Sequence, residues 1–427
     1  MNEQTYGSFS KAVHDRQSRR RTPGEVSIEV TRRCPLKCLH CYNNLPMNDR
    51  AARSQELTFE EHCKLLDELA EAGCLWLLYT GGEIFARADF LQIYTEAKKR
   101  GFLITLFTNG TLITPKVADY LAEWRPFAIE ITLYGATRET YEALTKVPGS
   151  YDRCLRGIRL LLERNLPLKL KTVPTTINQH EVYEMKRMSE EEFGVQFKFD
   201  PLVNPRIDCS QSPIEIRLSP EEAVTLDFMD QQREREYGEL VAKELEAAKN
   251  RKREVSTVYG CGGGLQACAI DPVGELTICV LSHQEGYNIR QGSFREGWEG
   301  PLREIRAKPI SRNTICTSCQ IRSVCSMCPA NGELENGDPE KPVDFLCKVA
   351  HLRVYVTGNE VPEHGDCACC KAGEVHDDLL ASAQRIRHTL ATGRRLPAPK
   401  TAEKFPILQA SGGCQSGGCA SCGESRP

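Results

Sequence analysis

Between residues 25 and 201, short runs of apolar and β-branched residues alternate with longer stretches in which apolar residues recur every three or four positions. The two periods indicate strands separated by amphipathic helices. The predicted strands are 26–30, 75–79, 102–107, 127–133, 168–173 and 195–199. The predicted helices are 58–72, 89–100, 115–123, 151–163 and 180–192, each ending near a Gly, Asn or Pro.

The strand runs are apolar on both faces, which is typical of a parallel sheet covered by helices and joined by right-handed crossovers. Six such units fit into about 180 residues, whereas a closed eight-unit barrel needs about 250. We therefore predict an α/β fold in which residues 25–215 form a partial (β/α)6 barrel.

After residue 215 the sequence no longer alternates between strand and helix patterns. Ser219 and Pro220 predict a helix start, followed by a charge-rich helical stretch with a break near Gly238. Its charges indicate a solvated face. From residue 259, Gly, Cys and short strand pairs replace long apolar runs, so a bound metal must supply much of the core there. The predicted parts are a tail at 1–24, a helical connector at 216–258, a small cysteine-rich domain with short β-hairpins and helices at 259–355, and a C-terminal helix with a Cys/Gly-rich tail at 356–427.

Composition narrows the possible partners. The 427 residues include 55 Lys and Arg against 58 Asp and Glu, a net charge of −3 that gives no field for binding nucleic acid or an anionic membrane. No run of 18 apolar residues is present, and the arginine-containing N-terminus has no apolar signal segment. These features predict a cytoplasmic protein without nucleic-acid or membrane partners.

Cysteine is the unusual residue, with 21 copies. In a reducing compartment so many thiols indicate metal ligation or catalysis rather than disulfides. Four are scattered and are predicted to be small buried hydrophobes: Cys63, Cys74, Cys154 and Cys209. The other seventeen fall in five groups: Cys34, Cys38 and Cys41; Cys261, Cys268 and Cys279; Cys316, Cys319, Cys325, Cys328 and Cys347; Cys367, Cys369 and Cys370; Cys414, Cys419 and Cys422.

The first group directly follows the first predicted strand. Cys34, Cys38 and Cys41 can hold three irons of a [4Fe–4S] cluster and leave the fourth iron open to a ligand. A structural zinc site usually has four protein ligands, and a fourth is absent locally. The spacing therefore favours an iron–sulfur cluster with an open iron.

Polar residues also end the next three strands. The second strand leads into Thr80-Gly81-Gly82-Glu83, the third into Thr108-Asn109-Gly110 and the fourth into Thr132-Leu133-Tyr134-Gly135. Parallel sheets bind ligands at these carboxyl ends. The glycines allow a close backbone approach, and Glu83 can accept hydrogen bonds from a cationic amino group.

With the C-x3-C-x2-C triplet and the Gly-Gly-Glu motif, residues 24–355 resemble the radical S-adenosylmethionine (radical SAM) superfamily. The resemblance implies that S-adenosylmethionine binds the open iron, that its C–S bond is cleaved reductively, and that a 5′-deoxyadenosyl radical abstracts hydrogen from substrate. It implies these roles: Cys34, Cys38 and Cys41 hold the cluster, Gly81, Gly82 and Glu83 contact the methionine amino group, and His40 lies by the adenine. Thr132 and Lys171 are candidates for the ribose or carboxylate; each could equally be an ordinary strand residue.

The second cysteine region resembles the SPASM extension of that superfamily, which contains two auxiliary [4Fe–4S] clusters. The resemblance implies Cys261, Cys268, Cys279 and Cys328 for one cluster and Cys316, Cys319, Cys325 and Cys347 for the other. Cys325 and Cys328 are separated by two residues where the family has three, which leaves the pairing open. Such clusters serve electron transfer or order the substrate site, or they only stabilise a small domain. The two C-terminal groups fit either a further metal site or a reactive thiol segment.

SPASM enzymes largely modify peptides and proteins. The expected function is therefore a radical SAM oxidoreductase that matures a ribosomally made peptide by a thioether or other crosslink, or by oxidation. The expected partners are a peptide or protein substrate, a reductant such as flavodoxin or ferredoxin and, since only 33 residues precede Cys34, a separate leader-recognition protein. Asp200, after the sixth strand, is a candidate acid or base, or else a cap on the following loop.

Three alternatives remain. A sulfatase-maturating enzyme is disfavoured because Val280 stands where that group has an aspartate. A small-molecule radical oxidase or decarboxylase is the second. The third belongs to another class, a non-catalytic iron–sulfur electron-transfer protein or zinc scaffold, and predicts no dependence on S-adenosylmethionine.

Overall fold

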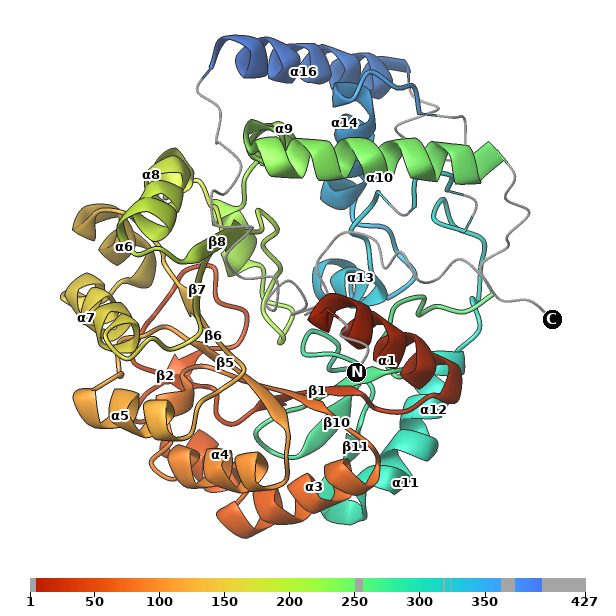
Figure 1. The fold of residues 1–427 in the computed structure, drawn as a ribbon. Coiled ribbons are helices and arrows are strands. Elements are labelled where there is room, and N and C mark those ends of the chain that lie inside the picture. Colours follow the sequence, from red (N-terminus) through yellow and green to blue (C-terminus); the bar gives the residue numbers. More distant parts are fainter. Residues whose placement is uncertain (1–4, 250–255, 318, 323, 362–372, 394–427) are drawn as a thin grey trace. The chain divides into compact units, whose positions relative to one another are not determined.

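The computed structural model describes residues 5–249, 256–317, 319–322, 324–361 and 373–393 (Figure 1). The chain divides into two compact units. Unit 1 comprises residues 1–216 and 262–307, and unit 2 comprises residues 217–261 and 308–427. Within the described ranges, no helix is both long and apolar enough to cross a membrane.

A nine-stranded sheet organises unit 1, in the order β11-β10-β9-β1-β4-β5-β6-β7-β8. Its strands are β1 (Glu25–Glu29), β4 (Trp76–Thr80), β5 (Leu103–Thr108), β6 (Ala128–Thr132), β7 (Leu168–Thr172), β8 (Gln196–Phe199), β9 (Ala267–Ile270), β10 (Glu275–Thr277) and β11 (Tyr287–Asn288). The run from β1 to β8 is parallel throughout. This confirms the predicted fold class and all six predicted strands of the partial barrel.

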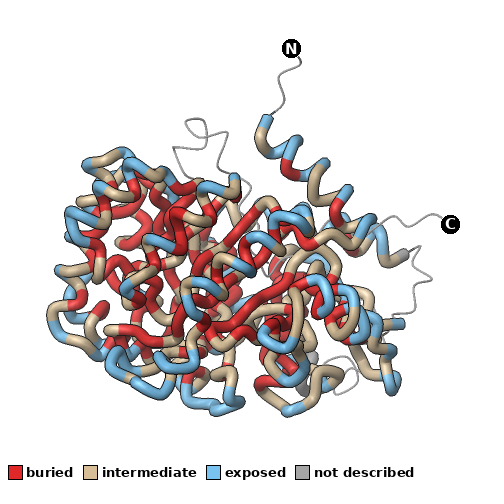
Figure 2. The backbone as a smooth tube through the Cα atoms, turned by 90° about the horizontal axis from the view of Figure 1, so that it is seen from below, coloured by how far each residue is buried: buried red, intermediate tan, exposed pale blue. Residues whose placement is uncertain are grey.

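Helices cover one face of this sheet (Figure 1). They are α3 (Phe59–Glu71), α4 (Phe90–Lys99), α5 (Pro115–Glu123), α6 (Arg138–Thr145), α7 (Ser150–Leu162) and α8 (Val182–Arg187). Strand side chains alternate between faces, and Tyr79 packs edge-on against Phe90 of α4. Buried residues follow the strands and the sheet-facing sides of these helices (Figure 2).

Local signals place most of these helices. Thr58 caps α3 in a capping box with Glu61, and Thr114 caps α5 ahead of Pro115. Two differences are found. Helix α6 was not predicted, and the predicted helix 180–192 is divided into a short 3-10 turn (Gln179–Glu181), α8 and a π-helical turn (Met188–Glu192).

The N-terminal residues are helical, which corrects the predicted tail at 1–24. Helix α1 (Tyr6–Arg20) is anchored by Trp76 of β4, whose Nε1 donates to the Tyr6 hydroxyl at 2.8 Å and whose ring stacks on His14 at 4.5 Å. Trp76 and Tyr79 lie on opposite faces of β4, so α1 packs on the face away from α3–α8. A tail was predicted because the helix has little apolar periodicity of its own.

Residues 262–307 extend the sheet of unit 1. Strand β9 pairs in parallel with β1, from Glu25 with Ala267 to Ile28 with Ile270. The predicted turn follows: Asp271 Oδ1 accepts from the amides of Val273 at 3.0 Å and Glu275 at 2.8 Å. Pairing covers an edge of β1 that an open sheet would leave exposed. These residues therefore belong with the sheet rather than with the rest of the cysteine-rich region.

The smaller elements of unit 1 complete the list. They are β2 (Arg33–Cys34), β3 (Leu45–Pro46), α2 (Arg50–Gln55), α11 (Phe294–Glu299) and α12 (Pro301–Ala307), with 3-10 turns at Ile84–Ala86, Ser212–Ile216 and Ile289–Gln291. Strands β2 and β3 pair in parallel and bracket the loop that holds Cys38 and Cys41.

Unit 2 is helical. Its helices are α9 (Pro220–Met229), α10 (Gln231–Lys249), α13 (Pro329–Asn336), α14 (Asp344–Val356) and α16 (Gly373–Thr392), the last as predicted. The break between α9 and α10 lies at Asp230, not at Gly238. Val224, Asp227 and Val241 are fully buried, so the predicted solvated connector contributes to the core of this unit.

Candidate active site

The triplet loop begins at the end of β2. Cys34 and Cys38 are buried and Cys41 is half-buried. The Leu36 amide and the Asn109 side chain lie 3.4 Å and 3.5 Å from the Cys34 sulfur. Burial, with smaller contributions from the charges of Glu83 and Cys41, raises the pKa of Cys34 to about 12.

The chemistry of this donor set fits a bound cluster. Burial, then the other two thiols, raise the pKa of Cys38 well above its usual range. Three such thiolates need a nearby cation, which a metal centre supplies. Among the residues that the structure describes, no three Cys, His, Asp or Glu side chains are gathered as a coordination sphere, so the ligand set stays a prediction.

The Gly-Gly-Glu turn touches the backbone ahead of the triplet. Gly81 has φ +133°, and a Cβ there would overlap the Thr31 carbonyl oxygen, as one on Gly82 would overlap the Arg32 carbonyl oxygen. The Gly82 amide donates to the Thr31 carbonyl oxygen at 2.7 Å. Glycine at both positions is therefore required for the end of β4 to lie against the loop that leads to Cys34.

Glu83 links the ends of β4 and β5. Its carboxylate accepts from the Thr108 hydroxyl at 2.7 Å, the Asn109 amide at 2.8 Å and the Phe85 amide at 3.2 Å. Burial raises its pKa to about 7, against these hydrogen bonds. The structure thus gives Glu83 a positioning role, and its contact with a methionine amino group remains a prediction.

The other predicted cofactor residues are separated along the sheet. The His40 ring lies 5.2 Å from that of Tyr134, and burial lowers its pKa to about 4, so it is neutral, as suits a neighbour of adenine. Thr132 ends β6.

The last two candidates have partners within the protein. Lys171 on β7 is ion-paired with Glu130. Asp200 accepts from the Leu202 amide at 3.1 Å, which is the geometry of a loop cap. Their cofactor and acid–base roles stay predictions.

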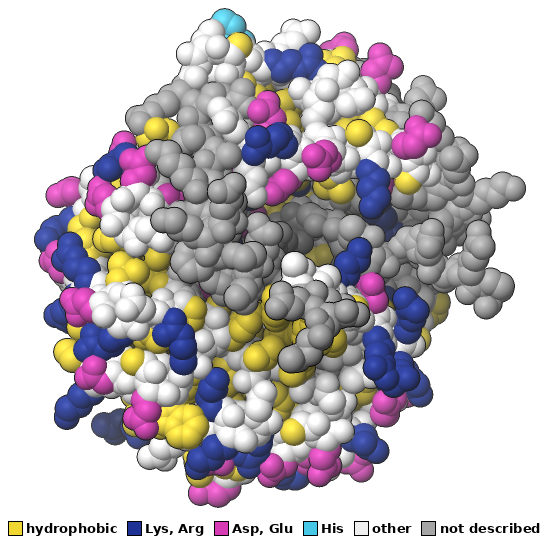
Figure 3. Space-filling view, in the orientation of Figure 1, with side chains coloured by type: hydrophobic (Ala, Val, Ile, Leu, Met, Phe, Trp, Pro, Cys, Tyr) yellow, Lys and Arg dark blue, Asp and Glu magenta, His cyan; other side chains and the backbone are white. Residues whose placement is uncertain are grey.

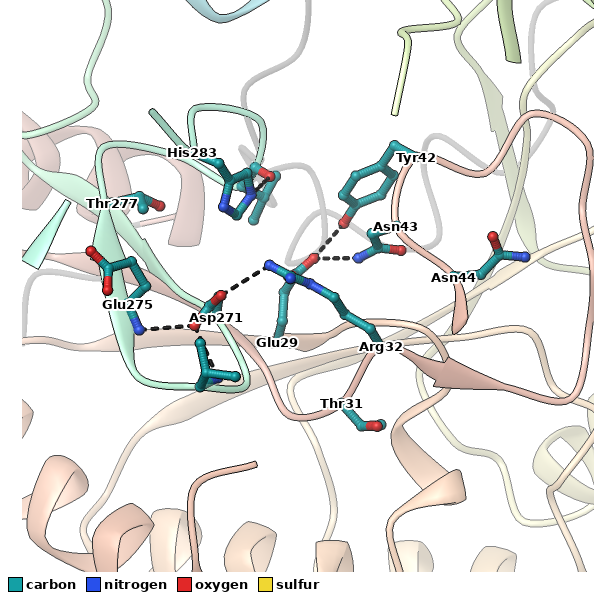
Figure 4. A network of polar contacts seen from close by, with 12 residues as sticks. Glu29, Thr31, Arg32, Tyr42, Asn43, Asn44, Asp271, Glu275, Thr277 and His283 are labelled. Carbon is teal, nitrogen blue, oxygen red and sulfur yellow. Dashed lines mark hydrogen bonds and ion pairs between the residues drawn. The ribbon is translucent and has the colours of Figure 1, made fainter. Parts of the chain in front are cut away.

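A buried polar network, absent from the sequence predictions, holds the triplet loop (Figure 4). Glu29 of β1 accepts from the Tyr42 hydroxyl at 2.8 Å and the Asn43 amide group at 2.5 Å. Arg32 lies 3.6 Å from Glu29 and 2.9 Å from Asp271 of the β9–β10 turn. Because Tyr42 and Asn43 follow Cys41, the network fixes the loop to both β1 and the added hairpin.

A sequence signal for this network did exist. Glu29 stands between the apolar residues Ile28 and Val30, as Glu130 stands between two isoleucines in β6, and a charge buried there needs partners. Burial raises the pKa of Glu29, while Arg32 and then Tyr42 lower it. The partners could not be identified because they lie on distant segments.

Arg206 holds the loop from the other side. Its guanidinium donates to the Cys41 carbonyl oxygen at 3.1 Å and to Asn44 Oδ1 at 2.8 Å. A hollow beside it is lined by Lys37, Cys38, Leu39, Asn44, Arg206, Ser212, Glu215 and Ile216. Access to Cys38 from this hollow suits a site that must admit a ligand.

In unit 2, four cysteines line one apolar cavity. They are Cys316, Cys319, Cys325 and Cys347, the set implied for an auxiliary cluster, and the other lining residues include Ile321, Val343 and Ala350. Burial, with smaller contributions from Cys319 and Cys316, raises the pKa of Cys325 to about 12. The donor set and the apolar walls fit a cluster with four thiolate ligands.

Arg353 of α14 supports the loop around Cys325. This fully buried side chain pairs with Asp227 at 2.8 Å and lies over the ring of Tyr237 at 4.4 Å. It also reaches the Val324 carbonyl oxygen at 3.4 Å and the Ser326 hydroxyl at 3.3 Å, on either side of Cys325.

The remaining cysteines are placed as follows. Cys268 lies on β9 and Cys279 follows β10 in unit 1, while Cys261 and Cys328 lie in unit 2, where burial and Cys261 raise the pKa of Cys328 to about 11. Cys74 and Cys154 are buried as predicted and Cys63 is half-buried. Cys209 is exposed, contrary to prediction, and lies in a loop with φ +65°. The six C-terminal cysteines, from Cys367 to Cys422, lie outside the described residues.

Comparisons with known proteins find a family model and relatives for this chain. Residues 28–188 match the model of the radical SAM superfamily. The chain is 27% identical over 337 residues to an AdoMet-dependent heme synthase of Methanosarcina barkeri, covering 74% of this chain and 94% of that protein. It is 26% identical over 366 residues to a PqqA peptide cyclase of Granulibacter bethesdensis, covering 80% and 93%. It is also 26% identical over 308 residues to the mycofactocin maturase MftC of Mycobacterium tuberculosis, covering 70% and 76%.

Solved structures show the same fold. Streptococcus suis SuiB superimposes with a TM-score of 0.59 at 18% identity, over 79% of this chain and 80% of that one. The anSMEcpe enzyme with bound AdoMet gives 0.52 at 16% identity, over 86% and 99%. The family implies S-adenosylmethionine and a [4Fe–4S] cluster as cofactors. Residues 28–188 therefore form a radical SAM domain, and the relatives that share it support an enzyme.

Proposed function

We propose that this enzyme uses a 5′-deoxyadenosyl radical to abstract hydrogen from a peptide or protein, and so matures a ribosomally made peptide by crosslinking or oxidation. The observation that supports it most directly is the alignment with the PqqA peptide cyclase along 93% of that protein's length. The SuiB structure bound to its precursor peptide SuiA has the same fold.

Within this proposal, Cys34, Cys38 and Cys41 hold the catalytic cluster. When bound, the cluster supplies the electron that cleaves the sulfonium bond of S-adenosylmethionine. Gly81 and Gly82 let the end of β4 approach the triplet loop, Glu83 takes the methionine amino group, and neutral His40 lies by the adenine. Thr132 and Lys171 remain candidates for the ribose or carboxylate, and Asp200 for an acid or base.

We also propose two auxiliary [4Fe–4S] clusters. The cavity lined by Cys316, Cys319, Cys325 and Cys347 supports one of them. The other would have the ligands that the resemblance to the SPASM extension implies, Cys261, Cys268, Cys279 and Cys328. Full thiolate ligation leaves no open iron, so these clusters serve electron transfer or the order of the substrate site.

The proposal includes partners. Reduction of the catalytic cluster requires a donor such as flavodoxin or ferredoxin, and a separate protein recognises the leader of the substrate peptide. Reduced thiols and labile clusters suit the cytoplasm.

Anaerobic reconstitution tests the proposal. With iron, sulfide, dithionite and S-adenosylmethionine, the protein should form 5′-deoxyadenosine and contain about 12 Fe, the sum of three four-iron clusters. Replacing Cys34, Cys38 and Cys41 by Ala should remove about four Fe and all 5′-deoxyadenosine, whereas Cys63→Ala should change neither. Co-expression with a neighbouring short reading frame should yield a peptide lighter by two hydrogens per site. A wild-type protein that makes no 5′-deoxyadenosine would refute catalysis.

A second candidate is supported by the heme synthase alignment, which spans 94% of that relative. A small-molecule oxidase or decarboxylase would change the mass of a porphyrin substrate and leave peptides unmodified. Incubating the reconstituted enzyme separately with iron coproporphyrin III and with the co-encoded peptide distinguishes the two.

A further inference from the structure

Three charged side chains gather on the face of the sheet opposite α3–α8. Glu130 of β6, Lys171 of β7 and Lys198 of β8 occupy positions that alternate with the buried residues Ile131, Leu170 and Phe197. Ile131 lies near Cys154 of α7, both being close to Gly110, so its face is the helix-covered one. Residues one position away therefore point to the other face.

One carboxylate is shared between two ammonium groups. Lys171 Nζ lies 3.1 Å from Glu130 Oε2, and Lys198 Nζ lies 2.9 Å from Glu130 Oε1. Lys171 also lies 2.9 Å from the centroid of the Phe107 ring, and neither lysine has another ion-pair partner in the described part of the chain. Lys171 and Lys198 thus share one negative charge, for which Lys169, opposite Glu130 in the β6–β7 register, also competes.

The surplus positive charge is partly buried. Glu130 has no exposed surface, while the side chains of Lys171 and Lys198 are 20% and 37% exposed. Burial lowers the pKa of Lys171 to about 8, despite Glu130. Burial also opposes ionisation of Glu130, yet Lys171 and Lys198 hold its pKa at about 2. A partly buried cation that is incompletely neutralised favours an anion beside it.

We propose that Lys171 and Lys198 bind a carboxylate of the substrate, namely an Asp or Glu side chain of the peptide. The inference rests on the proposed function, since it names a feature of that peptide. An ammonium group has three donors, and each lysine uses one toward Glu130. The exposed part of Lys198 provides the approach for an incoming carboxylate.

Sheet order separates this site from the carboxylate of S-adenosylmethionine. β7 is three strands and β8 four strands from β4, in the order β4-β5-β6-β7-β8. At roughly 4.8 Å per strand this is about 14 to 19 Å along the sheet. The methionine carboxylate is bonded to the same carbon as the amino group predicted at Glu83, which follows β4. It therefore belongs near β4, in the middle of the sheet and away from its β8 edge. This distance argues against the alternative role of Lys171 at the cofactor carboxylate and leaves the lysine pair for the substrate.

Calorimetry with a small dicarboxylate tests the proposal on the reconstituted holoenzyme. Wild type should bind glutarate at least tenfold more tightly than its uncharged isostere glutaramide. Lys198→Met should remove this preference, Lys198→Arg should retain it, and Lys116→Met, at an exposed position of α5, should match wild type. Glu130→Gln should increase the preference, because it removes the competing carboxylate. Equal binding of the two compounds by wild type would overturn the proposal, and needs no variant to fold.

A second arm separates the two possible carboxylates. The affinity of Lys198→Met for S-adenosylmethionine should stay within twofold of wild type, with thermal unfolding confirming that the variant is folded. A parallel loss of S-adenosylmethionine and glutarate binding would assign the site to the cofactor and refute the substrate proposal. Failure of the proposed function has a different signature, namely no 5′-deoxyadenosine from wild type whatever its glutarate affinity.

Discussion

The two units build their interiors differently. In unit 1, Ile28, Leu77, Ile104, Ile131 and Leu170 come from five neighbouring strands and are at most 1% exposed. In unit 2 the apolar cluster is small, comprising Val241, Ile321, Val324, Ala350 and Val354, and it adjoins a buried ion pair and a cavity lined by four thiols. Apolar packing suffices for the sheet, whereas the helical unit depends on charge pairing and on whatever its cysteines bind.

Loss of metal should show this contrast most strongly. Replacing Cys325 and Cys347 by Ser should unfold much of unit 2, because a structural metal site contributes on the order of 10 kcal/mol. In hydrogen exchange, the amides of α14 should lose protection while those of β4–β7 keep it. An equal loss of amide protection in both units would contradict the conclusion that unit 2 depends on its bound metal while unit 1 depends on apolar packing.

The buried ion pair gives the next largest effect. Arg353→Met leaves the fully buried Asp227 with Arg233 as its remaining counter-charge, and should cost up to about 3–5 kcal/mol in urea unfolding of unit 2. The double variant Asp227→Leu, Arg353→Met should recover most of this loss. Arg385→Met, which breaks the exposed pair with Glu221, is the matched control and should have a much smaller effect. Similar losses for Arg353→Met and Arg385→Met would mean that burial is not the cause.

Acid should weaken unit 1 through Glu130. Its folded pKa of about 2 lies below the ordinary value of 4.5, so its stabilisation is complete above pH 4.5 and is lost as pH falls toward 2. The loss should approach about 3 kcal/mol at most. Unfolding midpoints of wild type should fall over this window more steeply than those of Glu130→Gln. Parallel pH profiles would show that the lysine pair does not stabilise the carboxylate.

Helix caps should give the smallest effect and the same one in both units. Thr58 and Ser219 each accept from the backbone amide three residues on, at 3.1 Å and 3.2 Å. Thr58→Ala and Ser219→Ala should each cost about 1 kcal/mol in the unfolding of their own unit, and Thr58→Ser should cost less. A much larger loss of unfolding free energy for Ser219→Ala would mean that unit 2 has too little stability to remain folded when one helix cap is removed.

The difference between the interiors of the two units has no counterpart in the surface charges. On the face seen in Figure 3, basic and acidic side chains are intermingled, as the net charge of −3 suggests. The charges that distinguish the sites centre on three buried carboxylates: Glu29 with Arg32 near Asp271, Glu130 with its lysines, and Asp227 with Arg353.

The sequence alone determined what depends on local order along the chain. The alternation of apolar runs located the parallel strands, and cap residues located helix starts. Cys34, Cys38 and Cys41 with Gly81–Glu83 supplied the resemblance to the radical SAM superfamily. These features can be predicted from sequence because strand and helix periodicity, helix capping and a short cysteine motif all involve residues that are close together along the chain.

Only the tertiary structure decided which distant residues meet. It placed α1 on Trp76, β9 beside β1, Glu29 with Asp271, and Lys171 and Lys198 on one carboxylate. Each contact joins segments whose local patterns are compatible with many neighbours. Burial and charge compensation select among them, and both are properties of the folded chain rather than of any one segment.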